Sequence, residues 1–192
     1  MTTHPMHRLM RQHIEELVSL TDEEWAFMEP YFVYKKLKKH QFLVQEDNMV
    51  HHEYWIIKGL LKTYALDNEG KEHILHFARE AHWTSDYQAF HHQQPAKLFV
   101  ECIEDSEFFC LRYEEREMLC NKIPAMANFT RIKSNRGYVA LQQRILSLLT
   151  ETAEQRYQEF TMRFPDLVQR IPKKLLAAYL GVSRETLSRF RS

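Results

Sequence analysis

The sequence has 192 residues, of which 44% are hydrophobic and 12% aromatic, and its formal net charge is zero. This composition predicts a folded chain of one ordinary domain or two small ones, and four glycines and six prolines exclude collagenous and low-complexity chains. The first residues show no apolar leader, and no uncharged run reaches the roughly 18 residues of a membrane helix. Three cysteines without a CxxC pair are typical of a reducing compartment, so we expect a soluble, cytoplasmic protein.

Positive charge gathers at the carboxyl end of the sequence. From residue 170 to residue 192, six basic residues accompany one acid, Glu185, so that this segment carries +5 and the remainder −5. The basic residues are Arg170, Lys173, Lys174, Arg184, Arg189 and Arg191. A basic end on a neutral chain indicates a local contact with a polyanion.

The first segment, residues 4–31, has a helical pattern. Leu9, Ile14 and Leu17 recur at helical intervals. Thr21, followed by three acids, predicts the N-cap of a second helix, and Pro30 predicts its end.

Residues 31–111 contain short runs rich in β-branched and aromatic residues, separated by turn-forming clusters. The predicted strands are 41–45, 53–57, 60–66, 73–77, 97–103 and 108–111. The turns fall at 46–48, 58–59 and 67–70. Strands at roughly ten-residue spacing predict a sandwich or jelly-roll barrel.

A long helix is predicted from Pro124, which suits a first helical turn, to about residue 150. It carries two apolar stripes that are offset around the helix, which implies two packing partners. The first stripe is Met126, Phe129 and Ile132, and the second is Tyr138, Leu141, Ile145 and Leu148. The first stripe either packs on the chain's own barrel or meets a second copy as a coiled coil, and we take Met126, Phe129 and Ile132 as the candidate dimer contacts. Gly137 marks a bend in this helix or is simply tolerated there.

A further helix is predicted to begin after Thr152, because Thr152 and Gln155 have the spacing of a capping box. It continues to about Arg163, and Pro165 ends it. The chain is thereby divided into a sensor region with N-terminal helices (1–122), a dimerisation helix (123–150) and a C-terminal helical unit (151–192).

The last twenty residues have the pattern of a helix-turn-helix. Pro172 begins the first helix, Ala177 is small where the helices cross, and Gly181 supplies the positive φ of the turn. Ser183 caps the second helix. The residues expected to fill the angle between the helices are Leu176, Leu180, Val182 and Leu187.

The second helix presents side chains that match DNA base edges, since Arg pairs with guanine, Glu accepts from the cytosine amino group, and Ser or Thr does either. Lys173 and Lys174 begin the preceding helix and suit phosphate. The candidate DNA-binding residues are Lys173, Lys174, Ser183, Arg184, Glu185, Thr186, Ser188 and Arg189. The alternative is a pair of packed surface helices with a solvated charged face.

Residues 181–189, Gly-Val-Ser-Arg-Glu-Thr-Leu-Ser-Arg, resemble the recognition-helix signature of the Crp/Fnr family of bacterial transcription regulators. Residues 147–157 also resemble members from Bacteroidetes-type bacteria. The resemblance implies an α+β chain: an antiparallel, jelly-roll β-roll like a cyclic nucleotide-binding domain, a long dimerisation helix and a helix-turn-helix. It further implies a homodimer on double-stranded DNA with a palindromic operator, read by Arg184, Glu185 and Arg189.

The sequence departs from the family pattern at two places. Members that bind cyclic AMP carry Gly-Glu before a short helix and an Arg before the next strand, whereas residues 81–90 lack Gly-Glu and Lys97 is the nearby cation. We therefore expect no response to cyclic AMP, and any other small-molecule effector would contact Trp83, Ser85, Asp86, Tyr87 and Lys97. The sequence also ends at residue 192 without a wing or basic tail, so phosphate contacts should be fewer unless Arg170, Lys173 and Lys174 compensate.

No catalytic residue, metal or cofactor is predicted. The eleven histidines lack the His-x-His plus Glu pattern of a catalytic cupin, and three cysteines are too few for a four-cysteine iron–sulfur cluster. The rival to a regulator is a cupin-like small-molecule-binding protein or enzyme whose helical C-terminus is incidental.

Overall fold

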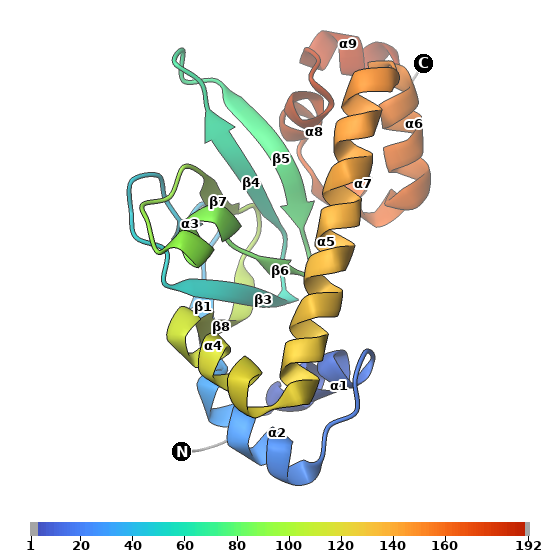
Figure 1. Cartoon of the computed structure of the whole chain (residues 1–192). Coiled ribbons are helices and arrows are strands. Elements are labelled where there is room, and N and C mark those ends of the chain that lie inside the picture. The colour runs from blue at the N-terminus through green and yellow to red at the C-terminus, as the bar shows by residue number, and fades with distance from the viewer. Residues whose placement is uncertain (1–3, 191–192) are drawn as a thin grey trace.

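The structure, a computed structural model, describes residues 4–190. A β-roll occupies the middle of the molecule, with helices below it and along one side (Figure 1). The roll consists of two antiparallel four-stranded sheets, with strand orders β1-β8-β3-β6 and β2-β7-β4-β5. The strands are β1 (Val33–Leu37), β2 (Phe42–Val44), β3 (His52–Lys58), β4 (Leu61–Leu66), β5 (Glu72–Ala78), β6 (Trp83–Thr84), β7 (Phe99–Cys102) and β8 (Ser106–Arg112). The predicted α+β class is confirmed.

The inner faces of the two sheets meet in an apolar core. Phe90, Phe108 and Leu61 are fully buried there, and Val100 and Ile56 pack beside them. Every predicted strand occurs, but two strands were not predicted. β1 carries Lys35 and Lys36 on an edge of its sheet, and β6 has only two residues, so neither has the length or alternation that marks a strand in sequence.

Two N-terminal helices, α1 (His7–Glu15) and α2 (Asp22–Met28), close one end of the roll. The predicted cap at Thr21 is confirmed: its hydroxyl accepts a hydrogen bond from the Glu24 N–H at 3.1 Å, and the Glu24 carboxylate accepts from the Thr21 N–H at 2.9 Å. Pro30 lies in a short 3₁₀ turn, Glu29–Tyr31, that follows α2.

The longest helix, α5 (Pro124–Thr150), follows α4 (Tyr113–Lys122) and runs beside the roll to the far end of the molecule (Figure 1). Its first half is fixed to the roll. Met126 and Phe129 have no exposed surface, because they pack in this chain's own core with Trp55 and Phe109. Lys133 then places its Nζ 2.6 Å from Oε2 of Glu53, which is 1% exposed.

The prediction that Met126 and Phe129 are dimer contacts is therefore wrong. Met126 and Phe129 cannot meet a second copy since they are fully buried, and Ile132 is partly buried. The second stripe is the one that is exposed, with Tyr138, Leu141, Ile145 and Leu148 at 69%, 55%, 50% and 47%. Helical periodicity reveals that there are two stripes, but not which of them the roll covers.

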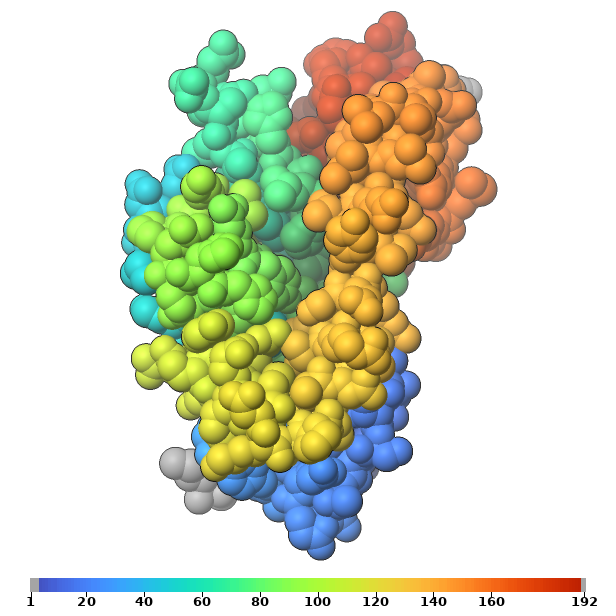
Figure 2. Space-filling view, in the orientation of Figure 1, coloured from blue at the N-terminus to red at the C-terminus, as the bar shows by residue number. Residues whose placement is uncertain are grey.

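The C-terminal helices form a unit at the upper end of α5 (Figure 2). They are α6 (Ala153–Arg163), α7 (Pro165–Arg170), α8 (Lys173–Leu180) and α9 (Arg184–Arg189). The capping box at Thr152 is confirmed, but Pro165 begins α7 at its first turn as well as ending α6. This unit packs on the roll, because Leu60 and Ile103 share one core with Leu176, Leu180 and Leu187.

Candidate nucleic-acid interface

The turn between α8 and α9 is built by a glycine, as predicted. Gly181 has φ +75°, and its N–H donates to the Ala178 carbonyl at 3.2 Å. The Val182 N–H donates to the Ala177 carbonyl at 3.0 Å, which completes a Schellman motif. A Cβ at Gly181 would meet nothing within 4 Å, so the backbone conformation, and not crowding, requires glycine there.

Ser183 caps α9. Its Oγ accepts from the Thr186 N–H at 3.1 Å, and one turn later Leu187 is buried at 2% exposure. Ala177, also 2% exposed, lies in the same core. The predicted helix-turn-helix geometry is therefore present in full.

The exposed face of α9 carries Arg184, Glu185, Ser188 and Arg189. Thr186 differs from them, because it is partly buried and its hydroxyl accepts a hydrogen bond from Nη2 of Arg189 at 3.3 Å. Hydrogen bonds from its own backbone N–H and from Ser183 lower the pKa of Glu185, so it is an anion at neutral pH. The face thus offers donors from arginine and acceptors from glutamate within two turns.

Lys173 and Lys174 are exposed in the first turn of α8. Their ammonium groups add to the positive end of that helix, which suits a phosphate. Arg191, counted in the basic segment, lies outside the described residues.

Arg170 is expected from the sequence to compensate for missing phosphate contacts, but its guanidinium is bound to carboxylates of the protein itself. Its Nη1 and Nη2 donate to the two carboxylate oxygens of Glu80, each at 2.9 Å, and its Nη2 also donates to Glu104 at 2.7 Å. These bonds tie α7 to the roll, and Arg79 beside β5 adds a bond to Asp166 at 2.7 Å. Burial raises the pKa of Glu80, but the bonds from Arg170 and from the Gly59 N–H outweigh it and lower this pKa to about 2.

The residues predicted to form an effector pocket have several different partners, although Trp83 and Tyr87 share one: the Nζ of Lys133 lies 4.1 Å and 6.0 Å from their ring centres. Trp83 Nε1 donates to Nε2 of His13 at 3.3 Å, on the side of α1, whereas Ser85 Oγ donates to the His52 carbonyl at 2.9 Å. The side chains of Lys97 and Tyr87 are exposed. The sequence could not reveal these partners, because His13 and His52 are distant from Trp83 and Ser85 along the chain.

Asp86 is a buried acid in the segment, residues 81–90, that lacks the family's Gly-Glu. It is 2% exposed and caps α3 (Tyr87–His92) by accepting from the Ala89 N–H at 3.1 Å. Its other oxygen accepts from the N–H groups of Lys97 and Leu98 at 2.9 and 3.2 Å. The backbone amides at this corner of the roll are thus already paired with a carboxylate of the chain itself.

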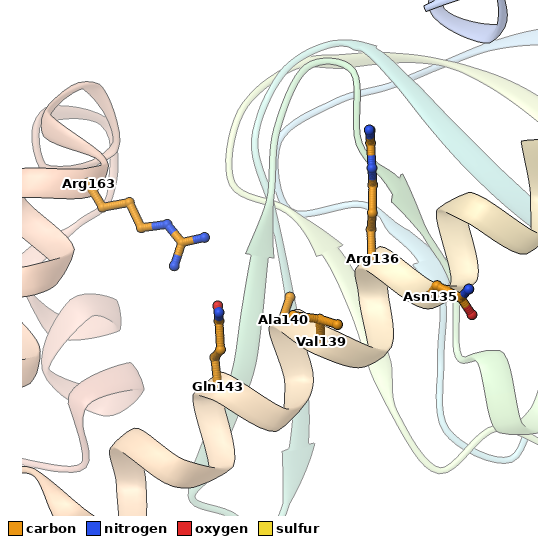
Figure 3. Close-up of a pocket in the computed structure, with 6 residues that line it drawn as sticks. All are labelled: Asn135, Arg136, Val139, Ala140, Gln143 and Arg163. Atoms are coloured by element: carbon orange, nitrogen blue, oxygen red, sulfur yellow. The ribbon is translucent and has the colours of Figure 1, made fainter. Parts of the chain in front are cut away.

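Two shallow grooves border α5. One of about 350 Å³ lies between α5 and the end of α6 and is drawn in Figure 3. Its lining residues are Asn135, Arg136, Val139, Ala140, Gln143 and Arg163. The other, of about 280 Å³, follows the exposed apolar stripe, and its lining residues are Tyr138, Leu141, Gln142, Ile145, Leu146 and Leu149.

Sequence reasoning missed two arginines that touch the end of α8. Nη2 of Arg144, on α5, donates to the Tyr179 carbonyl, and Nη2 of Arg156, on α6, donates to the Leu180 carbonyl at 2.8 Å. A signal for Arg144 exists, since it follows the buried Met126 by about five helical turns and so lies on the same face of α5.

Among residues 4–190, no cluster of three or more His, Cys, Asp or Glu side chains is arranged to hold a metal ion. No helix in this part of the chain has the length and apolar character to cross a membrane.

The cyclic nucleotide-binding domain family matches residues 34–122, and the comparison with curated proteins finds no match. FixK2 from Bradyrhizobium japonicum is similar in structure, with a TM-score of 0.74 at 17% identity, covering 83% of this chain and 82% of FixK2.

Two further solved structures are similar at low identity. The c-di-GMP-responsive global regulator CLP from Xanthomonas campestris has a TM-score of 0.68 at 14% identity, covering 88% of this chain and 87% of CLP. A transcriptional regulator of the CRP/FNR family from Thermus thermophilus has a TM-score of 0.65 at 18% identity, covering 82% of this chain and 83% of that protein. Residues 34–122 are therefore a cyclic nucleotide-binding-like domain, and the chain has the fold of the Crp/Fnr family of transcriptional regulators.

Proposed function

We propose that this protein is a dimeric, sequence-specific DNA-binding transcription regulator of the Crp/Fnr type, and that it acts by binding and not by catalysis. The observation that carries the proposal is the capped, glycine-turned helix pair whose second helix exposes Arg184, Glu185 and Ser188 together. Such a helix fits the major groove of B-DNA, where its first turns meet base edges. A role on DNA places the protein in the cytoplasm.

The role proposed for each residue follows from the chemistry of its side chain. Arg184 and Arg189 are suited to guanine, and the Glu185 carboxylate accepts from a cytosine amino group. Lys173 and Lys174 supply phosphate contacts, which strengthen binding to any duplex and depend on salt. Thr186 supports the exposed face of α9, because its hydroxyl accepts a hydrogen bond from Nη2 of Arg189.

A second copy of the chain is the proposed occupant of the exposed stripe on α5. Tyr138, Leu141, Ile145 and Leu148 are spaced by three, four and three residues, which is the a/d spacing of a coiled coil. The groove along this stripe offers space between the side chains for those of a partner. A two-fold axis along paired α5 helices would set two α9 helices about one DNA turn apart, so the operator should be an approximate palindrome.

We further propose that cyclic AMP is not the effector of this regulator. The amides that could hold a cyclic phosphate at the α3 corner already donate to Asp86, and a buried carboxylate at that point repels a second anion. An effector of different chemistry remains compatible with the fold, and it would act by changing the angle of the α5 helices.

Selection from a pool of duplexes with randomised sequence tests the function. We expect the full-length protein to enrich two inverted half-sites, and we expect the enrichment to disappear in the double variant Arg184→Ala/Ser188→Ala. The matched control is Arg163→Ala, which removes an exposed cation from α6 and should leave the enriched sequence unchanged. Recovery of random sequence by the wild-type protein would refute the proposal.

A further inference from the structure

The carboxyl end of α8 is held by two arginines from other helices. Nη2 of Arg144 donates to the Tyr179 carbonyl, and the Arg144 guanidinium stacks on the Tyr179 ring at 3.8 Å from the ring centre. These contacts join the middle of the second half of α5 to the last turn of α8. They immediately precede the glycine turn.

Arg156 makes a second connection of the same kind. Its Nη1 donates to the carbonyl of Glu151, the C-cap of α5, at 2.5 Å. Its Nη2 donates to the Leu180 carbonyl at 2.8 Å. One guanidinium therefore bridges the end of α5 and the end of α8.

Both arginines satisfy carbonyl groups that a helix end leaves without an intrahelical partner. No ion pair joins either guanidinium to a carboxylate among the described residues, and both instead lie at the negative carbonyl end of α8, with Arg156 also at that of α5. Burial lowers the pKa of Arg144, and the nearby Arg156 lowers it further.

This arrangement is not the one that stability alone would favour. The buried Nε atoms of Arg144 and Arg156 donate to no acceptor in the part of the chain that the structure describes, and such orphan donors are rare in folded proteins. Two like charges are also brought close together. What the pair does provide is a fixed geometry, since a planar guanidinium holds two acceptors in one orientation.

The next residues along the chain are the ones that read DNA in the proposed function. Gly181 follows Leu180 directly, and α9 begins at Arg184. Any rotation of the end of α8 relative to α5 therefore changes where Arg184 and Glu185 point. In a dimer built on α5, the same rotation changes the distance between the two recognition helices.

We propose that Arg144 and Arg156 are positioning residues for DNA recognition: they transmit the orientation of α5 to α9 and so set the half-site spacing that the dimer accepts. Neither residue contacts DNA in this role. The inference rests on the proposed function and deepens it, because it assigns the spacing of the operator to contacts inside the protein.

The test is a selection from duplexes that carry two inverted randomised half-sites separated by spacers of different lengths. The full-length wild type, Arg144→Ala, Arg144→Lys, Arg156→Ala and Arg156→Lys are each selected in parallel. The matched controls are Arg136→Ala on α5 and Arg163→Ala on α6, which remove exposed cations that lie at the groove in Figure 3 and not at α8.

We expect the wild type and both controls to enrich one spacer length. The Ala and Lys variants should enrich the same half-site sequence with a spacer distribution that is shifted by at least about one base pair or broadened, and their affinity for the wild-type site should fall about tenfold. Lys retains the charge but not the fork or the stacking, so it should not rescue the spacing. An unfolded variant would recognise no half-site. Retained half-site recognition with a changed spacer therefore distinguishes a positioning defect from a loss of fold.

Two results distinguish a failure of the positioning role from a failure of the proposed function. If the wild type enriches a site and folded variants keep its spacer length and its affinity within about twofold, the positioning role is wrong and the proposed function stands. If the wild type enriches no site, the proposed function itself fails. Should the Ala variants not fold, the Lys variants decide, together with hydrogen exchange at Val182 and Ser183, which must be faster in them than in the controls.

Discussion

The guanidinium of Arg170 forms a two-pronged hydrogen-bonded ion pair with the carboxylate of Glu80, and this pair fastens α7 to the end of strand β5. Glu104, which follows β7, approaches the same guanidinium at 2.7 Å. The roll and the helix-turn-helix are therefore joined directly as well as through α5.

Breaking this contact should loosen the C-terminal unit. Arg170→Ala leaves two carboxylates close together without their cation, and we expect it to lower the free energy of unfolding by about 1–2 kcal/mol, after allowance for the partial exposure of all three groups. Chemical denaturation measures the change. Arg79→Ala is the control, since its pair with Asp166 is more exposed and should be worth less than about 1 kcal/mol.

Acid should weaken the same contact. The pKa of Glu80 is about 2 in the folded chain against an ordinary 4.5, so its contribution to stability is complete above pH 4.5 and is lost as the pH falls from about 4.5 towards 2. The free energy of unfolding, measured from pH 6 to pH 3, should fall less steeply in Glu80→Gln than in the wild type. Equal slopes of this free energy against pH in the two proteins would contradict the ion pair between Glu80 and Arg170.

Two glycines should respond to alanine with opposite signs. Gly181 has φ +75°, where alanine is strained, so Gly181→Ala should destabilise the protein by about 1 kcal/mol or more. Gly137 lies inside α5 with nothing within 4 Å of an added Cβ, so Gly137→Ala should stabilise it by up to about 1 kcal/mol. Thermal unfolding of the two variants beside the wild type checks both signs, and a destabilising Gly137→Ala would contradict the second prediction.

The exposed stripe of α5 should determine the oligomeric state. Leu141→Glu and Ile145→Glu place charges where a partner would pack, and each should shift sedimentation from dimer towards monomer without loss of fold. Leu9→Glu, an equivalent exchange at an exposed site on α1, is the control. Phe129→Ala should instead cost about 3–5 kcal/mol of stability, because it leaves a cavity in the core. A dimer that survives both glutamate variants would rule out this interface.

Cyclic AMP should not stabilise the protein. A ligand at a hundred times its Kd raises the free energy of unfolding by about 2.7 kcal/mol, so 1 mM cyclic AMP would reveal a site of about 10 µM. We expect no shift in the unfolding midpoint. Asp86→Ala should itself destabilise the roll by about 1–3 kcal/mol, since one buried and two partly buried N–H groups lose their acceptor. A clear shift in the wild type would show that Asp86 does not block the corner.

The sequence predicts well what short stretches of chain decide. The caps at Thr21, Thr152 and Ser183 and the turn at Gly181 depend on a few consecutive residues, and all of them occur as predicted. The six predicted strands and the long helix α5 follow from local pattern in the same way.

What the sequence could not predict depends on contacts between distant segments. Arg170 looks like a phosphate ligand until the fold brings Glu80, 90 residues away, against it. Asp86 looks like part of a pocket until the backbone at residue 97 closes on it. The choice between the two stripes of α5 likewise depends on where the roll lies, which periodicity does not encode.

The central claim is that α9 reads DNA sequence, and the most direct measurement compares Arg184→Ala with the wild type on the selected duplex and on a scrambled one. We expect this variant to bind the selected duplex about 1–3 kcal/mol more weakly and the scrambled duplex about as well, whereas Lys173→Ala should weaken both and lower the salt dependence. If the wild-type protein binds the two duplexes equally, or Arg184→Ala keeps its full discrimination between them, the claim is contradicted.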